Sequence, residues 1–197
     1  MAAFTVVYDA CVLYPAPLRD LLIRLAQTGL FQARWTEAIL DEVFRSILAD
    51  RPDLKPEQLS RTRELMNAAV RDCQVTGYEQ LIDAMVLPDP DDRHVLAAAA
   101  HCGALVVVTA NVKDFPESAL APHGIEAQPP DEFVMNLVDL APEVVMEAVT
   151  KQAAALKKPA ITVEGLLAIL EKSGLTRTVA ELRALRRRAE EPPAREG

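Results

Sequence analysis

The feature that most restricts the fold of this 197-residue chain is the uninterrupted apolar run Ala104-Leu-Val-Val-Val108. A strand with one face in solvent alternates apolar and polar residues, whereas this run has no polar position. It therefore predicts a central strand of a parallel sheet that is covered by helices on both faces. Polar residues follow at once in Thr109-Ala-Asn-Val-Lys-Asp114, so this strand brings Asn111 and Asp114 to the carboxyl edge of the sheet.

A second strand is expected at Phe4-Thr-Val-Val-Tyr8, a β-branched and aromatic run that ends at Asp9. In an open parallel sheet, ligands bind at the edge where the strands end, so Asp9 is a candidate for that edge. Strands are also expected within residues 31–35, 73–76 and 125–128, with helical patterns between them. This alternation predicts a three-layer α/β/α domain with a parallel central sheet.

The pattern changes near Pro142, after which only helical periodicity recurs. Three helices are expected, over residues 143–156, 162–173 and 176–188. We therefore expect a main domain over residues 1–140, a helical extension over 141–190 and a frayed tail over 191–197.

Three carboxylates gather in Leu87-Pro-Asp-Pro-Asp-Asp-Arg-His-Val95, at the start of an apolar helical run. Asp89, followed by a proline, has the position of a helix N-cap. Asp92 instead shares a helix face with the apolar residues three, four and seven positions further on, so it points toward the core. A carboxylate on a buried face needs a cationic partner, and a metal ion is one candidate.

Glu42 lies within a helix that Thr36 is expected to cap, beyond the first turn, so capping cannot explain it. Ordinary structural roles stay open for the candidate residues. Glu42 could be a solvated surface residue, and Asp9 could cap the turn that follows its strand. Asn111 and Asp114 could equally serve as turn or cap residues.

The chemistry of this set favours a divalent cation. Carboxylates that lie close together raise one another's pKa, and Mg²⁺ or Mn²⁺, which prefer hard oxygen ligands, relieve the repulsion. Such a site can activate water and stabilise the leaving oxygen of a phosphodiester. We find no Ser-His-Asp signature and no glycine-rich phosphate loop, so metal-assisted hydrolysis is the preferred reading.

Composition narrows the class of protein. Residues 1–150 carry 11 basic and 23 acidic side chains, a net charge of −12, which excludes a general nucleic-acid binder. Arg19, Arg93 and Lys113 lie near the acidic motifs and are candidates for phosphate contacts. The three cysteines are widely spaced, no 18-residue apolar run is present and the N-terminus has no basic leader, so we expect a cytoplasmic protein without a membrane span.

Four motifs occur here in the order typical of one nuclease family. They are Val6-Val-Tyr-Asp9, Thr36-x-x-Ile39-x-x-Glu42, Asp91-Asp-Arg-His-Val-Leu-Ala-Ala and Val108-Thr-Ala-Asn-Val-Lys-Asp114-Phe. The chain resembles PIN-domain nucleases of the VapC type, the toxin ribonucleases of bacterial type II toxin–antitoxin pairs, over about residues 4–128. The resemblance implies an Mg²⁺- or Mn²⁺-dependent endoribonuclease that acts on RNA, forms a homodimer and is restrained by an antitoxin protein.

On this resemblance the catalytic candidates are Asp9, Glu42, Asp92 and Asp114, with Asn111 as a further metal ligand. Many family members have Asp at the position of Asn111, so the identity of the fourth site residue stays open between Asn111 and Asp114.

Other classes of protein were weighed. A haloacid-dehalogenase-type phosphatase needs a second Asp two residues after the first, where this chain has Cys11. A receiver domain has its acidic pair early in the chain, whereas the acidic cluster here lies near residue 90. The serious alternative is a catalytically degenerate PIN fold that binds protein or RNA.

The end of the chain has its own pattern. The basic run Arg183-Ala-Leu-Arg-Arg-Arg188 accompanies an apolar seam at helical spacing, formed by Leu175, Val179, Leu182 and Leu185. The seam could pack within the protein, form a dimer or antitoxin surface, or guide RNA to the acidic site.

Overall fold

The structure, a computed structural model, describes residues 4–190. The chain divides into two compact units, the first ending at Pro130 and the second beginning at Asp131. The tail expected over residues 191–197 lies outside the described residues.

The first unit alternates short strands and helices. Its elements are β1 (Thr5–Tyr8), α1 (Ala10–Leu13), α2 (Ala16–Ala26), β2 (Gln32–Arg34), α3 (Glu37–Asp50), α4 (Pro56–Ala69), the 3₁₀ helices η1 (Glu79–Ala84) and η2 (Pro90–Asp92), α5 (Arg93–His101), β3 (Val106–Val108), η3 (Val112–Asp114), α6 (Glu117–Leu120), η4 (Ala121–His123) and β4 (Glu126–Gln128).

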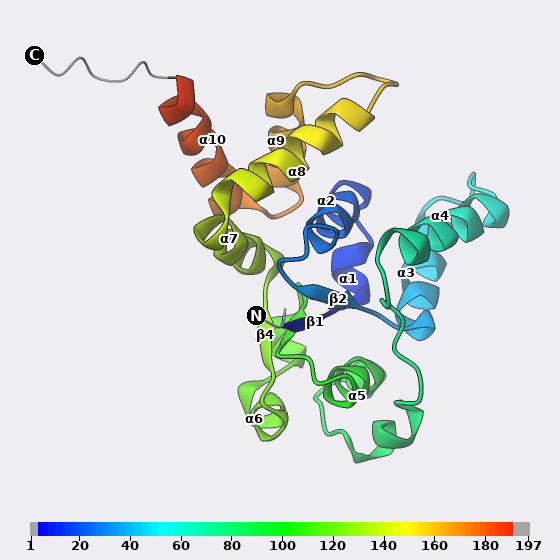
Figure 1. Ribbon diagram of the computed structural model, residues 1–197. Coiled ribbons are helices and arrows are strands. Elements are labelled where there is room, and N and C mark those ends of the chain that lie inside the picture. The colour runs from blue at the N-terminus through cyan, green and yellow to red at the C-terminus, as the bar shows by residue number, and fades with distance from the viewer. Residues whose placement is uncertain (1–3, 191–197) are drawn as a thin grey trace, which may run out of the picture. The chain divides into compact units, whose positions relative to one another are not determined.

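The four strands form one sheet in the order β2-β1-β3-β4, with every pair parallel. The two central strands are in register at Tyr8 and Val108, so the chain leaves both strands at the same edge. Helices α1 and α2 lie on one side of the sheet and α5 on the other (Figure 1). The prediction of a helix-covered parallel sheet with a buried Val106–Val108 strand is therefore confirmed.

Local side-chain caps set where the helices near this edge begin. The hydroxyl of Thr36 accepts a hydrogen bond of 3.0 Å from the backbone N–H of Ile39, which starts α3 as predicted. Asp89 accepts one of 2.9 Å from the N–H of Asp91, so it is a cap, also as predicted. The cap fixes the turn that presents Asp92 immediately before α5.

The structure differs from the sequence-based expectation at one strand. Residues 73–76, expected to form a strand, contribute only a bridge between Trp35 and Gln74. The segment that follows forms the 3₁₀ helix η1. Helix α4 buries Leu59 and Met66, whereas its Leu65 is 52% exposed.

The second unit is helical. It contains α7 (Pro130–Leu140), α8 (Pro142–Ala155), α9 (Val163–Lys172) and α10 (Thr176–Glu190). The carboxylate of Asp131 accepts hydrogen bonds of 2.9 Å from the backbone N–H groups of Arg177 and Thr178. Because these bonds tie the start of α7 to the start of α10, α7 groups with the later helices, ten residues ahead of the boundary expected at residue 140.

Within residues 4–190, the structure has no helix whose length and apolar character would allow it to cross a membrane.

Candidate active site

Asp9 is fixed where β1 ends. Its side chain is 4% exposed. One carboxylate oxygen accepts a 2.6 Å hydrogen bond from the N–H of Ala10, and the other accepts bonds from the Thr109 hydroxyl at 2.7 Å and the Cys11 thiol at 3.0 Å. Asp9 therefore caps α1 and also lies at the carboxyl edge of the sheet. The sequence had offered these two roles as alternatives, and the residue has both positions.

Thr109 and Cys11 connect the two central strand ends. Thr109 is fully buried, and its hydroxyl accepts a 3.0 Å hydrogen bond from the N–H of Asn111. The N–H of Ala110 donates to the Cys11 sulfur at 3.1 Å. Burial and the negative charge of Asp9 raise the pKa of Cys11 to about 12, so it stays a thiol that can donate to that carboxylate. This network holds the turn that carries Asn111 against Asp9.

Asp92 faces the same space from the start of α5. Partial burial, together with the negative charges of Asp9, Asp89, Asp114 and Glu42, raises its pKa from 3.8 to about 7. Every charge that contributes to this rise in pKa is negative. This arrangement attracts a cation.

Glu42 comes from α3, and its side chain is 36% exposed. Its Oε1 lies 2.7 Å from Nε2 of His94. The two side chains form an ion pair when His94 is protonated. Within the described chain neither ring nitrogen of His94 has an aligned hydrogen bond, so this contact is close but not well directed. The first turn of α5 therefore meets the middle of α3 next to Asp92.

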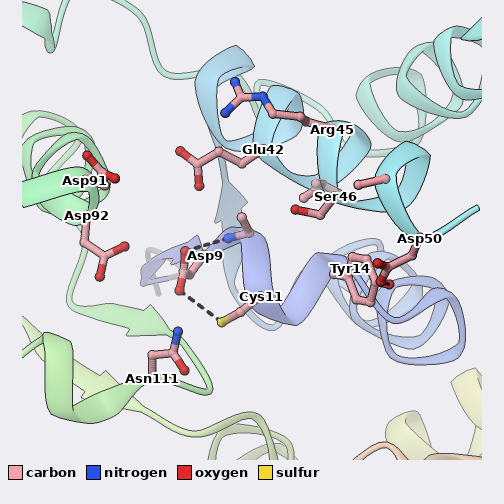
Figure 2. Close-up of a pocket in the computed structure, with 13 residues that line it drawn as sticks. Asp9, Cys11, Tyr14, Glu42, Arg45, Ser46, Asp50, Asp91, Asp92 and Asn111 are labelled. Atoms are coloured by element: carbon pink, nitrogen blue, oxygen red, sulfur yellow. Dashed lines mark hydrogen bonds between the residues drawn. The ribbon is translucent and has the colours of Figure 1, made fainter. Parts of the chain in front are cut away.

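These segments enclose one cavity of about 890 Å³ (Figure 2). Four of the five candidate residues line it: Asp9, Glu42, Asp92 and Asn111. Asp114 is not among the residues lining it, although its charge acts on Asp92. The geometry thus favours Asn111 over Asp114 as the residue that the β3 edge presents to the cavity.

Sequence reasoning missed one wall of this cavity. The same face of α3 that carries Glu42 contributes Arg45, Ser46, Ala49 and Asp50, three, four, seven and eight residues further on. That spacing is the helical repeat and could have revealed them. None of the expected phosphate contacts Arg19, Arg93 and Lys113 is among the lining residues described. Arg19 donates instead to the backbone oxygens of Leu13 and Tyr14, at 2.7 and 3.1 Å.

The donor set fits a hard divalent cation in its chemistry, because it offers carboxylate and amide oxygens in a partly desolvated space. Its arrangement is open: among residues 4–190, no three His, Cys, Asp or Glu side chains converge closely enough to hold one ion. Asp9 is locked by its hydrogen bonds, whereas Asp92 and Glu42 are part-exposed. A rotation of these two side chains would be needed to complete a site around Asp9.

The fold is that of a PIN domain. The family model described as PIN domain matches residues 5–113, more than half of the chain, and the chain belongs to that family. A second family model, described as the VapC50 C-terminal domain, matches residues 130–184, which covers most of the second unit.

Among curated proteins, the chain is similar to one of Mycobacterium tuberculosis (strain ATCC 25618 / H37Rv) named "Putative ribonuclease VapC50". The two are 42% identical over 91 residues, which are 46% of this chain and 53% of the relative. The aligned region thus spans about half the length of that protein. No solved structure matches the chain.

Proposed function

We propose that this chain is a metal-dependent endoribonuclease that hydrolyses RNA phosphodiester bonds, and that it is the toxin of a type II toxin–antitoxin pair. The observation that carries this proposal is the convergence of Asp9, Glu42, Asp92 and Asn111, from four separate segments of a PIN domain, on one cavity. The name of the mycobacterial relative supports ribonuclease activity and the VapC class.

In the proposed mechanism Asp9 is the metal ligand whose orientation is set before the ion binds. Three hydrogen bonds orient its carboxylate, so it would hold an Mg²⁺ or Mn²⁺ ion with little loss of side-chain freedom on binding. Asp92, Glu42 and Asn111 would complete the ligand set. When bound, the divalent ion supplies water of lowered pKa and positive charge at the leaving oxygen.

The residues of the chain carry out the remaining tasks. The buried Thr109 hydroxyl holds Asp9 and the Asn111 turn together, which keeps the two ligands of the sheet edge in place. Asp92 and Glu42, on helices that face each other across the cavity, would hold the attacking water and accept its proton. Asp114 would add negative charge behind Asp92 without touching the substrate.

The proposal extends to partners and location. The match of the second unit to the VapC50 C-terminal domain favours a VapC-type toxin, and hence a cognate antitoxin protein as its inhibitor. A homodimer and a cytoplasmic location follow from the same class of protein.

The alternative is a degenerate PIN fold that binds RNA or protein without cleaving. The open arrangement of the acidic side chains in the described residues is the observation that favours it.

Cleavage of a mixture of structured RNAs by the purified chain tests the proposal. We expect cleavage with Mg²⁺ or Mn²⁺, none with EDTA, and a loss of at least 100-fold for Asp9→Asn and Asp92→Asn, as is usual for residues in the reacting site. Asp83→Asn is the matched control, because Asp83 is exposed on η1 and does not line the cavity. Full activity in both site variants contradicts the nuclease assignment, and folded wild-type protein without any cleavage supports the degenerate alternative.

A further inference from the structure

The cavity has a second end that the proposed hydrolysis does not use. Figure 2 shows Asp92, Asp9 and Asn111 at one side, and Tyr14, Ser46 and Asp50 at the other, with Arg45 above them on α3. All of these side chains line the same space. The cavity therefore offers a place for a nucleotide next to one whose scissile phosphate lies at the acidic side.

Arg45 is unusual in these surroundings. Five carboxylates line the cavity, those of Asp9, Glu42, Asp50, Asp91 and Asp92, and Arg45 is the one cation among the lining residues that the structure describes. It is exposed and makes no ion pair within residues 4–190. Its position is one helical turn beyond Glu42, so a phosphate bound by it would lie next to the acidic end. An unpaired guanidinium offers a phosphate two parallel hydrogen bonds.

Tyr14 supplies a different kind of contact. It follows α1, is half-buried, and its hydroxyl donates a hydrogen bond to Asp50 at the end of α3. The bond fixes the ring at the wall of the cavity and occupies an oxygen of the nearest carboxylate. An aromatic ring and an unpaired Arg that line the same cavity can together bind an unpaired nucleotide, because a base can stack on the ring only when it is free of a duplex.

We propose that Tyr14 and Arg45 form a nucleotide subsite, in which Arg45 binds the phosphate next to the scissile one and Tyr14 stacks an unpaired base. This inference rests on the proposed function, since the acidic end defines which phosphate is scissile.

The test measures binding separately from cleavage. A fluorescently labelled single-stranded oligoribonucleotide is titrated with the full chain carrying Asp92→Asn, which removes cleavage and one negative charge, and anisotropy is followed at several salt concentrations. Adding Arg45→Ala should weaken binding about tenfold and reduce the salt slope by about 0.7, as expected for one phosphate contact on a single strand. Arg71→Ala is the matched control, because Arg71 is almost fully exposed and does not line the cavity.

The tyrosine is tested by two substitutions that keep an apolar side chain. Tyr14→Leu should weaken binding roughly tenfold with an unchanged salt slope, whereas Tyr14→Phe, which keeps the ring, should bind within twofold of the parent. A duplex of the same sequence should bind more weakly and should not distinguish these variants. Thermal denaturation verifies that each variant is folded.

The outcomes separate the two proposals. If the wild-type chain cleaves RNA but Arg45→Ala and Tyr14→Leu bind as the parent does, the subsite is wrong and the nuclease assignment stands. Unchanged salt slope in Arg45→Ala, or equal losses in Tyr14→Phe and Tyr14→Leu, also overturns the subsite. If the wild-type chain fails to cleave while the subsite variants lose binding as expected, the nuclease assignment fails and the subsite stands. If the Asp92→Asn protein binds no oligoribonucleotide at all, the subsite is overturned as well.

Discussion

At the scale of single residues, Asp9 and Asp92 lie in opposite environments although both face the same cavity. Asp9 receives hydrogen bonds from an N–H, a hydroxyl and a thiol. Asp92 is partly buried and lies near other carboxylates, and both effects destabilise its charged form. The same replacement by Asn therefore has opposite consequences for folding stability at the two positions.

The raised pKa of Asp92 predicts a pH-dependent gain from Asp92→Asn in metal-free buffer. Because the folded state binds this proton more tightly than the unfolded state does, Asp92 lowers the free energy of unfolding progressively as pH rises from about 4 to about 7. The difference between a pKa of 3.8 and about 7 corresponds to about 4 kcal/mol, and solvent screening of this part-exposed group reduces it to about 1–2 kcal/mol. Urea denaturation of both proteins at pH 4.5 and pH 8 measures the effect.

Two variants bracket this result. Asp83→Asn should shift stability equally little at both pH values, because Asp83 is exposed. Asp9→Asn should lower the free energy of unfolding by about 1 kcal/mol or more. One carboxylate oxygen becomes an amide nitrogen, which cannot accept the hydrogen bond that this oxygen now receives from Ala10 or Thr109. Parallel pH profiles for the wild type and Asp92→Asn would mean that the other carboxylates do not act on Asp92.

At the scale of elements, three faces of α3 have different roles. Ile39, Leu40, Val43 and Phe44 are buried and anchor the helix, whereas Glu42, Arg45 and Ser46 line the cavity. Glu37 begins the helix on a third face, where its carboxylate pairs with Arg63 at 2.6 Å and accepts a 3.1 Å hydrogen bond from Asn67 on α4. Two glutamates five residues apart on one helix therefore have separable roles.

We predict that Glu42→Gln weakens Mn²⁺ binding about tenfold or more, because a charged ligand of the proposed site becomes neutral. Glu37→Gln should leave Mn²⁺ affinity within twofold and lower stability by up to about 1 kcal/mol, through its exposed ion pair with Arg63. Isothermal titration with Mn²⁺ and urea denaturation measure the two effects. If both variants lose metal affinity equally, or neither does, Glu42 is a surface residue and the ligand set needs another member.

The sequence predicted most of these elements because their signals are local. The apolar run before Thr109 indicated the central strand, and the Thr36 and Asp89 caps marked where two helices begin. The bond from Thr109 to Asp9 could not be inferred, because it joins residues 100 positions apart whose contact depends on the order of strands in the sheet. The sequence also could not tell that Asn111 lines the cavity and Asp114, at the end of the 3₁₀ helix η3, does not.

At the scale of the whole molecule, charge is handled differently in the two units. The first unit concentrates carboxylates around one cavity, where RNA would meet repulsion unless a cation is bound. In the second unit the basic run of α10 is paired with acids of the same unit: Arg183 with Glu164 and Glu171, at 2.8 and 2.9 Å. The excess positive charge seen in the sequence is thus partly neutralised within the unit, which weakens the reading that it guides RNA.

The apolar seam of α10 also finds its partners inside the second unit. Leu175, Val179 and Leu182 are fully buried, as are Leu166, Leu167 and Leu170 of the neighbouring α9. Contacts link α8 with α9 and α9 with α10, so the three helices form one core. Packing within the chain, the first of the three uses considered for the seam, accounts for these residues, whereas Leu185 is only partly covered.

Because these helices share one core, we predict that removing part of the second unit is more harmful to stability than removing all of it. A chain ending after Lys158 keeps α7 and α8 but loses α9 and α10, so the buried Val145 and Val149 of α8 become exposed. Their exposure costs about 2–3 kcal/mol each and creates an aggregation-prone surface. A chain ending at Pro130 removes the whole unit and keeps every residue of the acidic cavity. We therefore expect the shorter chain to be more soluble than the longer one and to retain metal-dependent cleavage.

Size-exclusion chromatography, thermal denaturation and RNA cleavage of the full chain, 1–158 and 1–130 measure this order. Arg187→Ala in the full chain is the control for charge alone, because that side chain is exposed at the end of α10. If 1–158 is as stable and soluble as the full chain, α9 and α10 do not form a core with α8, and the seam serves another purpose. If 1–130 is stable and active but becomes monomeric or escapes its antitoxin, the second unit is a separately folded unit that also carries an assembly surface. Loss of RNA affinity together with a shallower salt slope in 1–130 would instead restore the RNA-guiding role, because only removal of phosphate contacts reduces that slope.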